Sequence, residues 1–441
     1  MGAERRGNVK QPSGQAQPRH TREEACYSAK SFDIDKWQVA KAYQLVKANA
    51  GAAGIDRVSL EDFERNLKDN LYTVWNRLAS GSYHPPAVMG VDIPKKSGGT
   101  RRLGIPTVAD RIAQMVVKLE FEPAVEPHFL PDSYGYRPGK SALDAIEVTR
   151  RRCWDSDWVL EFDIQGLFDN IPHELLLKAV DHHTDVPWVK LYIRRWLAAP
   201  MQLASGEVVL RKWGTPQGGV ISPVLANLFL HYVLDVWLTR RFPKVPWCRY
   251  ADDGLLHCKT EGQARFMLKM LARRMAECGL ALHPEKTKIV YCKDGRRNGE
   301  ATHTQFDFLG YTFRRRSVRG SSGKQLRLGF VPAVSKTALN AMRQRLRKLR
   351  IRQRTDLSLQ QLARGLNPIL RGWLAYYGAF YRSEMYRLVR HLNKSLVRWA
   401  MRKYGHLKRH KSRAIAVLER VSKQRPQLFA HWQQGMSGAL A

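Results

Sequence analysis

The sequence has few cysteines and none of them are paired. Its six cysteines stand singly in a chain of 441 residues, without a Cys-x-x-Cys: Cys26, Cys153, Cys248, Cys258, Cys278 and Cys292. Most structural zinc sites use such pairs, and disulfide frameworks belong mainly to small secreted domains. The sequence therefore argues against a zinc-ribbon or disulfide-stapled protein and predicts reduced thiols.

Long apolar runs are also absent. The most apolar stretch, residues 220–238, is interrupted by five polar or helix-breaking residues. A membrane-spanning helix needs about 20 nearly unbroken apolar residues. Residues 1–30 lack the apolar run of a secretory signal. We therefore expect no membrane partner.

Acidic residues are scarce relative to basic ones. Asp and Glu number 39 against 74 Lys and Arg, which gives a net charge of +35 and a pI near 10.2. Such an excess is self-repelling and usually implies a polyanionic partner. Nucleic acid is the first candidate. An anionic membrane surface would be the second, but the lack of long apolar segments argues against it.

The positive charge is concentrated late in the chain. Residues 314–425 contain 30 Lys and Arg against 3 Asp and Glu, a net of +27. Arginine forks and aromatic faces suit phosphates and unstacked bases, although several aromatics here must belong to the core. The residues that we expect to bind RNA are Arg343, Arg347, Arg350, Arg371 and Trp373.

Helices and strands alternate as far as about residue 330, and only helices are expected beyond it. The predicted strands are 91–94, 103–105, 157–162 and two within 248–258 that a tight turn joins. The predicted helices include 36–48, 173–183, 220–238 and 263–278. In residues 335–350 a helical stripe is expected to be buried: Leu339, Met342, Leu346 and Leu349.

Carboxylates gather at two places in this basic chain. Asp163 ends a predicted strand, and Asp252 and Asp253 occupy a predicted hairpin turn. Adjacent carboxylates raise one another's pKa unless a cation sits between them. Mg²⁺ prefers a few carboxylate oxygens, and two such ions about 3.5–4 Å apart can clamp an in-line phosphoryl displacement. Asp-Asp-Gly is also ordinary turn chemistry, so this motif by itself leaves both interpretations open.

Five motifs in a fixed order resemble those of reverse transcriptases. They are Phe162-Asp163 with Phe168; Gly214–Gly219 with Ser222-Pro223 and Asn227; Tyr250-Ala251-Asp252-Asp253; Gly279-Leu280 with Pro284–Lys288; and Phe308-Leu309-Gly310-Tyr311. Three further segments resemble group II intron-encoded proteins: Gly51–Asp56, Ser133–Ser141 and Leu366–Trp373. Each motif is short, but they occur in the family's order, and the resemblance covers about residues 36–405.

The resemblance implies an α+β fold, a right-hand polymerase whose fingers and palm contain a ferredoxin-like antiparallel palm sheet, followed by an α-helical thumb. The implied divisions are a disordered basic N-terminus (1–35), an N-terminal extension and start of the fingers (36–90), the fingers and palm (91–315), the thumb or maturase domain (316–405) and a short basic tail (406–441). The tail carries no Cys-rich cluster, so no HNH endonuclease is expected.

The resemblance also assigns site residues. It makes Asp163, Asp252 and Asp253 the catalytic ligands of two Mg²⁺ ions, for which Mn²⁺ can substitute, with the Ile164 carbonyl as a further ligand. Phe168 would exclude the 2′-OH of an incoming nucleotide, or else be a core aromatic. The other nucleotide-binding candidates are Lys95 and Arg101 (with Lys96 and Arg102 as competitors), Gln217, and Lys286, which could equally be a surface lysine.

The function implied is RNA-directed DNA polymerisation, with dNTPs, an RNA template, a DNA primer and a structured intron RNA as partners. Assistance to splicing and retrohoming is implied as well, in the bacterial cytosol or nucleoid. Two alternatives stay open at this point. One is a domesticated relative in DNA repair or defence, and the other is an RNA-binding splicing cofactor with incidental polymerase activity.

Overall fold

The computed structural model describes residues 31–94, 98–319 and 326–439. The chain forms two compact units. The first comprises Met1–Phe121, Thr184–Arg211 and Gly218–Ile221, and the second comprises Glu122–His183, Lys212–Gln217 and Ser222–Ala441.

The first unit packs helices around a four-stranded sheet of order β2-β1-β4-β5. Its elements are α2 (Lys36–Asn49), α3 (Leu60–Arg65), α4 (Leu67–Ala79), β1 (Val88–Pro94), β2 (Thr100–Ile105), most of α5 (Val108–Val125), α9 (Pro187–Ala198), β4 (Met201–Gln202) and β5 (Val208–Val209). The predicted hairpin at 91–105 is confirmed as β1 and β2. A buried carboxylate, Asp110, ties this unit together by accepting hydrogen bonds from Tyr83, Gln114 and Trp196.

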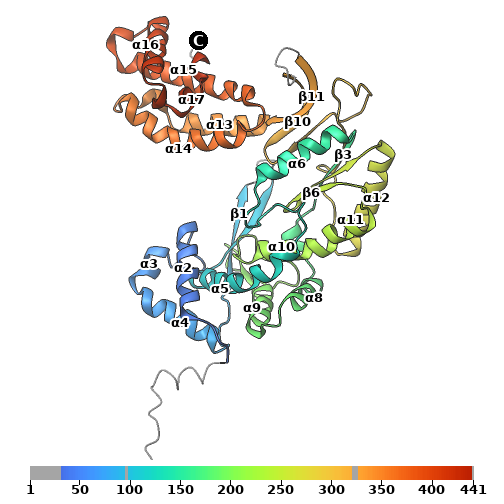
Figure 1. Cartoon of the computed structure of the whole chain (residues 1–441). Coiled ribbons are helices and arrows are strands. Elements are labelled where there is room, and N and C mark those ends of the chain that lie inside the picture. The colour runs from blue at the N-terminus through green and yellow to red at the C-terminus, as the bar shows by residue number, and fades with distance from the viewer. Residues whose placement is uncertain (1–30, 95–97, 320–325, 440–441) are drawn as a thin grey trace, which may run out of the picture. The chain divides into compact units, whose positions relative to one another are not determined.

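The second unit contains an antiparallel sheet of order β6-β7-β3-β8. Its strands are β3 (Trp158–Asp163), β6 (Trp247–Tyr250), β7 (Asp253–Cys258) and β8 (Lys288–Tyr291). Consecutive β3 residues, Val159 and Leu160, are both fully buried, so both faces of the sheet are covered. Helix α6 (Ala142–Asp155) packs against β6 and β7, and α12 (Glu261–Glu277) packs against β3, β7 and β8 (Figure 1). This confirms the expected antiparallel sheet.

Shorter elements and a second sheet complete this part of the unit. They are α7 (Leu167–Asn170), α8 (His173–His183), α10 (Ser222–Leu230), α11 (Val236–Arg241), and the sheet β11-β10-β9 made by β9 (Gln305–Phe308), β10 (Tyr311–Arg319) and β11 (Leu326–Val334). The long helix expected at 220–238 is interrupted, because His231–Asp235 forms a π-helical turn between α10 and α11. Residues 231 and 235 are both buried.

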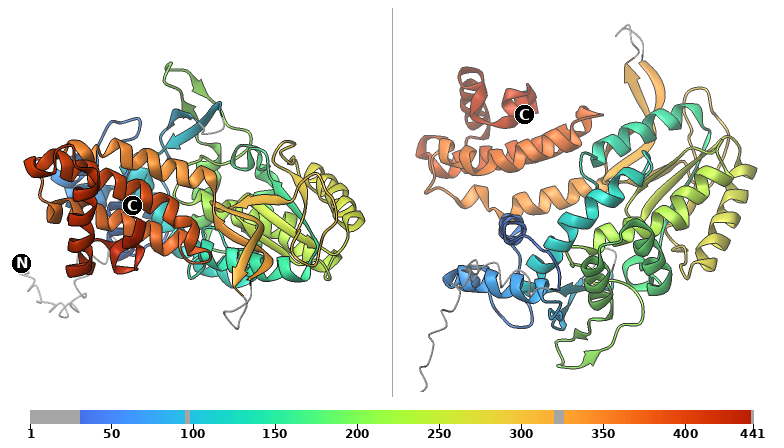
Figure 2. Two further views of the ribbon diagram at one scale, coloured as in Figure 1. Left: turned by 90° about the horizontal axis from the view of Figure 1, so that it is seen from above. Right: turned by 60° about the horizontal axis from the view of Figure 1, so that its bottom comes forward.

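The chain is helical from Lys336 onward, whereas residues 316–334, which the resemblance assigned to the helical thumb, include the end of β10 and the whole of β11. The helices of this region are α13 (Lys336–Lys348), α14 (Leu359–Tyr377), α15 (Tyr386–Lys403), α16 (Lys411–Gln424) and α17 (Ala430–Gln433), and the first three lie side by side in Figures 1 and 2. Leu339, Met342 and Leu346 are buried as predicted. The prediction for Leu349 was wrong: it follows the end of α13 and is 37% exposed.

Residues beyond 405 belong to the core of this helical region. Leu418 of α16 and Phe429 and Trp432 near α17 are buried in one cluster with Leu392 and Trp399 of α15. These residues were expected to form a basic tail, and the apolar stripe on α16 explains why they fold instead. Among the described residues, no helix has the length and apolar character to cross a membrane.

We predict that His431 makes this helical region sensitive to acid. Burial lowers the pKa of the His431 imidazole to about 3, and its Nε2 lies 2.8 Å from Asn393 Oδ1. In the unfolded chain the His431 imidazole takes up a proton near pH 6.5, whereas in the fold it stays neutral to a much lower pH. The stability that the neutral imidazole contributes is therefore complete above pH 6.5 and is lost as the pH falls toward 3. At pH 5 the loss is about 2 kcal/mol.

A His431→Gln variant should be less stable than wild type near neutral pH, and this difference in stability should become smaller in acid. Urea unfolding of both proteins at pH 7.5 and pH 5 gives the measurement. The difference in unfolding free energy between wild type and variant should shrink by about 2 kcal/mol at the lower pH. An unchanged difference would mean that His431 is protonated at the same pH in the folded and unfolded states.

Candidate active site

Three carboxylates meet where strands of the second unit end. Asp163 is the last residue of β3 and pairs in register with Asp253, the first residue of β7. Asp252 precedes it in the turn between β6 and β7. The turn is tied to β3 because the Ile164 N–H donates to the Asp252 carbonyl at 3.3 Å. The structure thus brings together the triad that the sequence predicted.

The charges at this site are incompletely neutralised. Lys286 Nζ lies 2.9 and 3.0 Å from the two carboxylate oxygens of Asp163. Desolvation, followed by the negative charges of Asp252 and Asp163, raises the pKa of Asp253 to about 7. Asp253 is exposed, but the surface that it exposes lines a cavity, where the carboxyl is partly desolvated. A proton or a cation is therefore favoured between these groups.

The cavity beside the triad has a volume of about 360 Å³. It is lined by Glu161, Phe162, Asp163, Asp253, Gly254, Glu285, Lys286, Lys288, Asp307 and Phe308. Burial raises the pKa of Glu161 to about 7, opposed by Lys288, whose Nζ lies 3.1 Å from a carboxylate oxygen. Sequence reasoning missed Glu161, yet its position two residues before Asp163 places both on one face of β3.

The donor set suits a hard divalent cation. Within the described ranges, no group of three or more His, Cys, Asp or Glu side chains is arranged to hold a metal ion by itself. Mg²⁺ does not require such a cage, because it commonly uses one or two carboxylates together with water and substrate phosphates. Asp163 and Asp253 face each other in register at the ends of β3 and β7. This pair of like charges fits that mode of binding.

The nucleotide-binding candidates are divided among several places. Gln217 donates a hydrogen bond from Nε2 to Asp169 at 3.1 Å, next to α7. Phe168 is only 8% exposed, and its carbonyl accepts a hydrogen bond from Thr215 N. Phe168 and Gln217 are not among the residues that line the cavity beside the triad.

The fingers candidates lie in the first unit. Arg101 is an exposed residue of β2, and its competitor Arg102 forms an ion pair with Asp92 at 2.9 Å. Lys95 and Lys96 lie outside the described residues.

A second cavity, of about 310 Å³, lies within the basic region. Its lining includes five cationic side chains and one carboxylate: Arg314, Arg316, Lys336, Arg343, Arg387 and Glu384. Arg316 is only 7% exposed; burial, followed by the charge of Arg314, lowers its pKa to about 10. Arg314 and Arg343 are half-buried, whereas Lys336 and Arg387 are exposed. An anion in this cavity would offset the excess of positive charge around Arg316.

The other RNA-binding candidates differ in exposure. Arg347, Arg350 and Arg371 are exposed. Desolvation lowers the pKa of His391 of α15, and the charges of Arg347 and Arg343 lower it further. These two arginines therefore lie on the side of α13 near His391. Trp373 is half-buried and packs against the helical core, so it combines a structural role with an accessible edge.

Comparison with known proteins matches two regions of the chain. A model described as reverse transcriptase (RNA-dependent DNA polymerase) matches residues 93–313. A model described as group II intron, maturase-specific domain matches residues 339–415.

The chain is also similar to individual proteins. Protein YkfC of Escherichia coli K12 is 31% identical over 64% of this chain and 81% of its own length. The group II intron-encoded protein LtrA of Lactococcus lactis is 34% identical over 43% of this chain, and the match spans 32% of LtrA. A structure of telomerase from Candida albicans, in complex with a TWJ fragment of telomeric RNA, aligns with 86% of this chain and 68% of that chain, at a TM-score of 0.43 and 10% identity.

Proposed function

The chain belongs to the reverse transcriptases of the group II intron type, which are RNA-directed DNA polymerases, and we propose that Asp163, Asp252 and Asp253 carry its polymerisation chemistry. The observation that carries the proposal is the pairing of Asp163 with Asp253 at the ends of β3 and β7, beside a cavity. The substrates would be dNTPs, an RNA template and a DNA primer, in the bacterial cytosol or nucleoid.

Each residue of the site has a part in this proposal. Asp163, Asp252 and Asp253 would hold two Mg²⁺ ions, with the Ile164 carbonyl as a further ligand, and Mn²⁺ could replace Mg²⁺. When bound, the ions would neutralise charge on the attacking and leaving oxygens of the transfer. Lys286, which neutralises Asp163 in this structure, would be released by a competing cation. Its ammonium group would then be available to the departing pyrophosphate.

The residues outside the triad would bind the nucleotide. Lys95 and Arg101 would contact the triphosphate from the fingers hairpin, as cations commonly do. Gln217 and Phe168 would contact the base and sugar. Since Gln217 is hydrogen-bonded to Asp169 and Phe168 is buried, both would be held in place before the nucleotide arrives.

Primer extension provides the test of this function. The purified chain should add dNTPs to a DNA primer annealed to an RNA template, in the presence of Mg²⁺ or Mn²⁺ and not of EDTA. Products should follow the template sequence. A folded protein that incorporates no nucleotide on any primed template would refute the proposed function.

The basic helical region would bind structured intron RNA and assist its splicing. The maturase-specific match to residues 339–415 supports this, as does the cationic cavity that Arg343 lines. Arg347, Arg350, Arg371 and the exposed edge of Trp373 would extend the contact. Splicing of a group II intron RNA at low Mg²⁺, with and without the protein, tests this part of the function.

We predict that Phe168 controls the choice of sugar. A Phe168→Val variant would open space beneath the incoming ribose, so incorporation of rNTPs relative to dNTPs should rise at least about tenfold. Single-nucleotide kcat/KM for both substrates gives the measurement. Phe229→Leu, which trims a buried aromatic of α10, is the control for core damage. An equal ratio in wild type and Phe168→Val would assign Phe168 to the core alone.

A further inference from the structure

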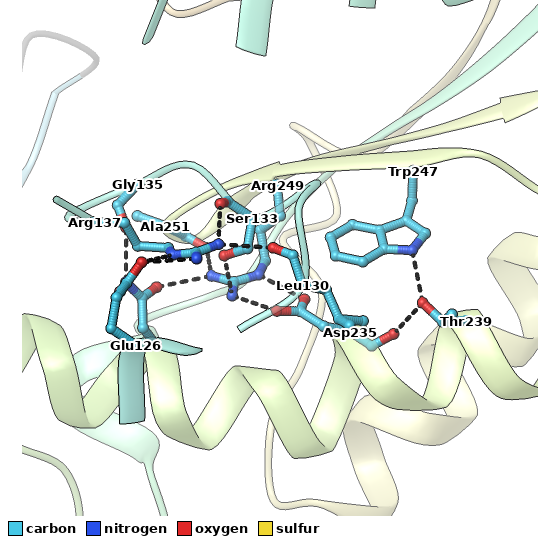
Figure 3. A network of polar contacts seen from close by, with 11 residues as sticks. Glu126, Leu130, Ser133, Gly135, Arg137, Asp235, Thr239, Trp247, Arg249 and Ala251 are labelled. Carbon is cyan, nitrogen blue, oxygen red and sulfur yellow. Dashed lines mark hydrogen bonds and ion pairs between the residues drawn. The ribbon is translucent and has the colours of Figure 1, made fainter. Parts of the chain in front are cut away.

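The Ser133–Ser141 motif has no role in the chemistry proposed above, yet part of it contacts the catalytic turn. Ser133 forms a β-bridge with Arg249 of β6. The Tyr134 N–H donates to the Arg249 carbonyl at 2.9 Å, and the Arg249 N–H donates to the Asp132 carbonyl at 3.0 Å. Figure 3 shows this segment beside Ala251, the residue that precedes Asp252.

Arg249 is fully buried and all five of its guanidinium N–H groups have acceptors. Nε and Nη2 donate to the two carboxylate oxygens of Asp235, at 2.8 and 2.6 Å. Nη2 also donates to Ser133 Oγ at 2.8 Å, and Nη1 donates to Asn227 Oδ1 at 3.0 Å. The remaining Nη1 bond, at 3.1 Å, goes to the carbonyl of Ala251 (Figure 3). Only arginine offers five donors in this planar arrangement.

The turn that receives this bond has an unfavourable backbone conformation. Ala251 has a φ of 57°, in the left-handed region, which costs a residue with a Cβ roughly 1–2 kcal/mol. Gly135 closes the other side of the turn: a Cβ on residue 135 would lie 2.4 Å from the Ala251 nitrogen. The Gly135 carbonyl is itself held by Asn227 Nδ2 at 2.7 Å.

The acidic partner comes from the π-helical turn. Asp235 is fully buried and is the last residue of that turn, and Asn227 lies two turns earlier on α10. Because π-helical turns rotate the residues beyond them relative to an α-helix, they often occur where a side chain must be re-aimed. Here the re-aimed side chain is the counter-ion of Arg249.

We propose that Ser133, Gly135, Asn227, Asp235 and Arg249 form a turn clamp, whose function is to fix the left-handed turn at Ala251 and thereby the positions of Asp252 and Asp253. Its members are positioning residues. The clamping of the turn is a property of the fold and does not depend on the proposed function. Only its expected effect on polymerisation rests on that function.

Two variants test the clamp in different ways. Arg249→Lys removes donors, while Gly135→Ala leaves every charge and donor in place and adds a Cβ against the Tyr250–Ala251 backbone. Arg152→Lys is the matched control, because Arg152 joins the same two segments through Asp132 and the Trp247 carbonyl without reaching the turn. Thermal unfolding identifies any variant that fails to fold.

For primer extension, both clamp variants should lower kcat about a hundredfold, as expected for a displacement near 1 Å at the reacting groups. The Mg²⁺ concentration for half-maximal rate should rise at least tenfold, while KM for dNTP changes little. Arg152→Lys should retain wild-type values. Wild-type Mg²⁺ dependence and kcat in a folded Gly135→Ala variant would overturn the proposal.

Hydrogen exchange gives a readout that does not require polymerase activity. Amides of a peptide covering residues 247–256 should exchange at least tenfold faster in both clamp variants than in wild type or Arg152→Lys. If wild type extends no primer, the proposed function fails, and exchange still decides the clamp. Unchanged exchange at the turn in both clamp variants would refute it.

Discussion

An Asp253→Asn variant should lose primer extension by about a thousandfold or more, while its thermal stability above pH 7 without divalent cations rises. Activity falls because a neutral amide cannot replace the charged oxygen donor in the transfer. Stability rises because desolvation, followed by the neighbouring charges of Asp252 and Asp163, raises the pKa of this carboxyl to about 7. Its ionised form is therefore disfavoured in the fold, and asparagine removes that penalty.

The pH dependence of stability tests whether ionised Asp253 destabilises the fold. For a carboxyl whose pKa is raised on folding, the stabilising effect of the proton is complete below pH 3.8 and is lost as the pH rises through 7. The advantage of Asp253→Asn over wild type should therefore grow between pH 5 and pH 8. Asp69→Asn, at an exposed position of α4, is the matched control and should keep full activity. Near-normal extension by a folded Asp253→Asn protein would remove Asp253 from the chemistry.

Replacing Arg343, Arg347 and Arg350 with glutamine should weaken the binding of structured RNA and reduce its dependence on salt. Each phosphate contact contributes roughly 0.7–0.9 to the slope of log K against log salt, so loss of three contacts should lower the slope by about 2–3. Glutamine preserves helix propensity at positions 343 and 347 of α13, and the buried residues of that helix are left intact. Arg350 lies beyond the end of the helix, with a φ of 47°. Primer extension on a short, saturating template should change less than RNA affinity does.

The control for this variant removes the same charge elsewhere. Arg151, Arg265 and Arg273 are exposed on α6 and α12, and each is paired with a glutamate of its own helix. If the two triple variants have equal salt slopes, the effect arises from net charge and not from the α13 surface. RNA binding would then have to depend on other basic residues.

The predictable parts of the fold and site are those set by residues close together in the chain. The Asp252-Asp253-Gly254 turn and the flanking apolar residues predicted the β6–β7 hairpin, and the charge pattern identified the helical region. The predicted proximity of Asp163, however, came from the resemblance to a family, since no local rule pairs residues 90 positions apart.

What the sequence did not predict depends on distant partners. The π-helical turn in the helix expected at 220–238 ends at Asp235, which is buried against Arg249. The sequence near Asp235 does not predict that ion pair. Lys286 was considered as a surface lysine or a proton donor, but its ion pair with Asp163 spans 123 positions. Leu349 fits a helical stripe and is nevertheless exposed, because α13 ends one residue earlier.

The π-helical turn also fixes the phase of the helix that contains it. A single extra residue in an α-helix shifts everything beyond it by about 100° around the axis. Residues before the turn, such as Asn227, and residues after it, such as Leu238, are both buried. Their buried faces are offset from each other around the helix axis by this extra rotation. Deleting one residue between them would give a regular helix but would rotate one buried stripe out of its contacts. This stretch of chain therefore tolerates substitution more readily than any change in its length.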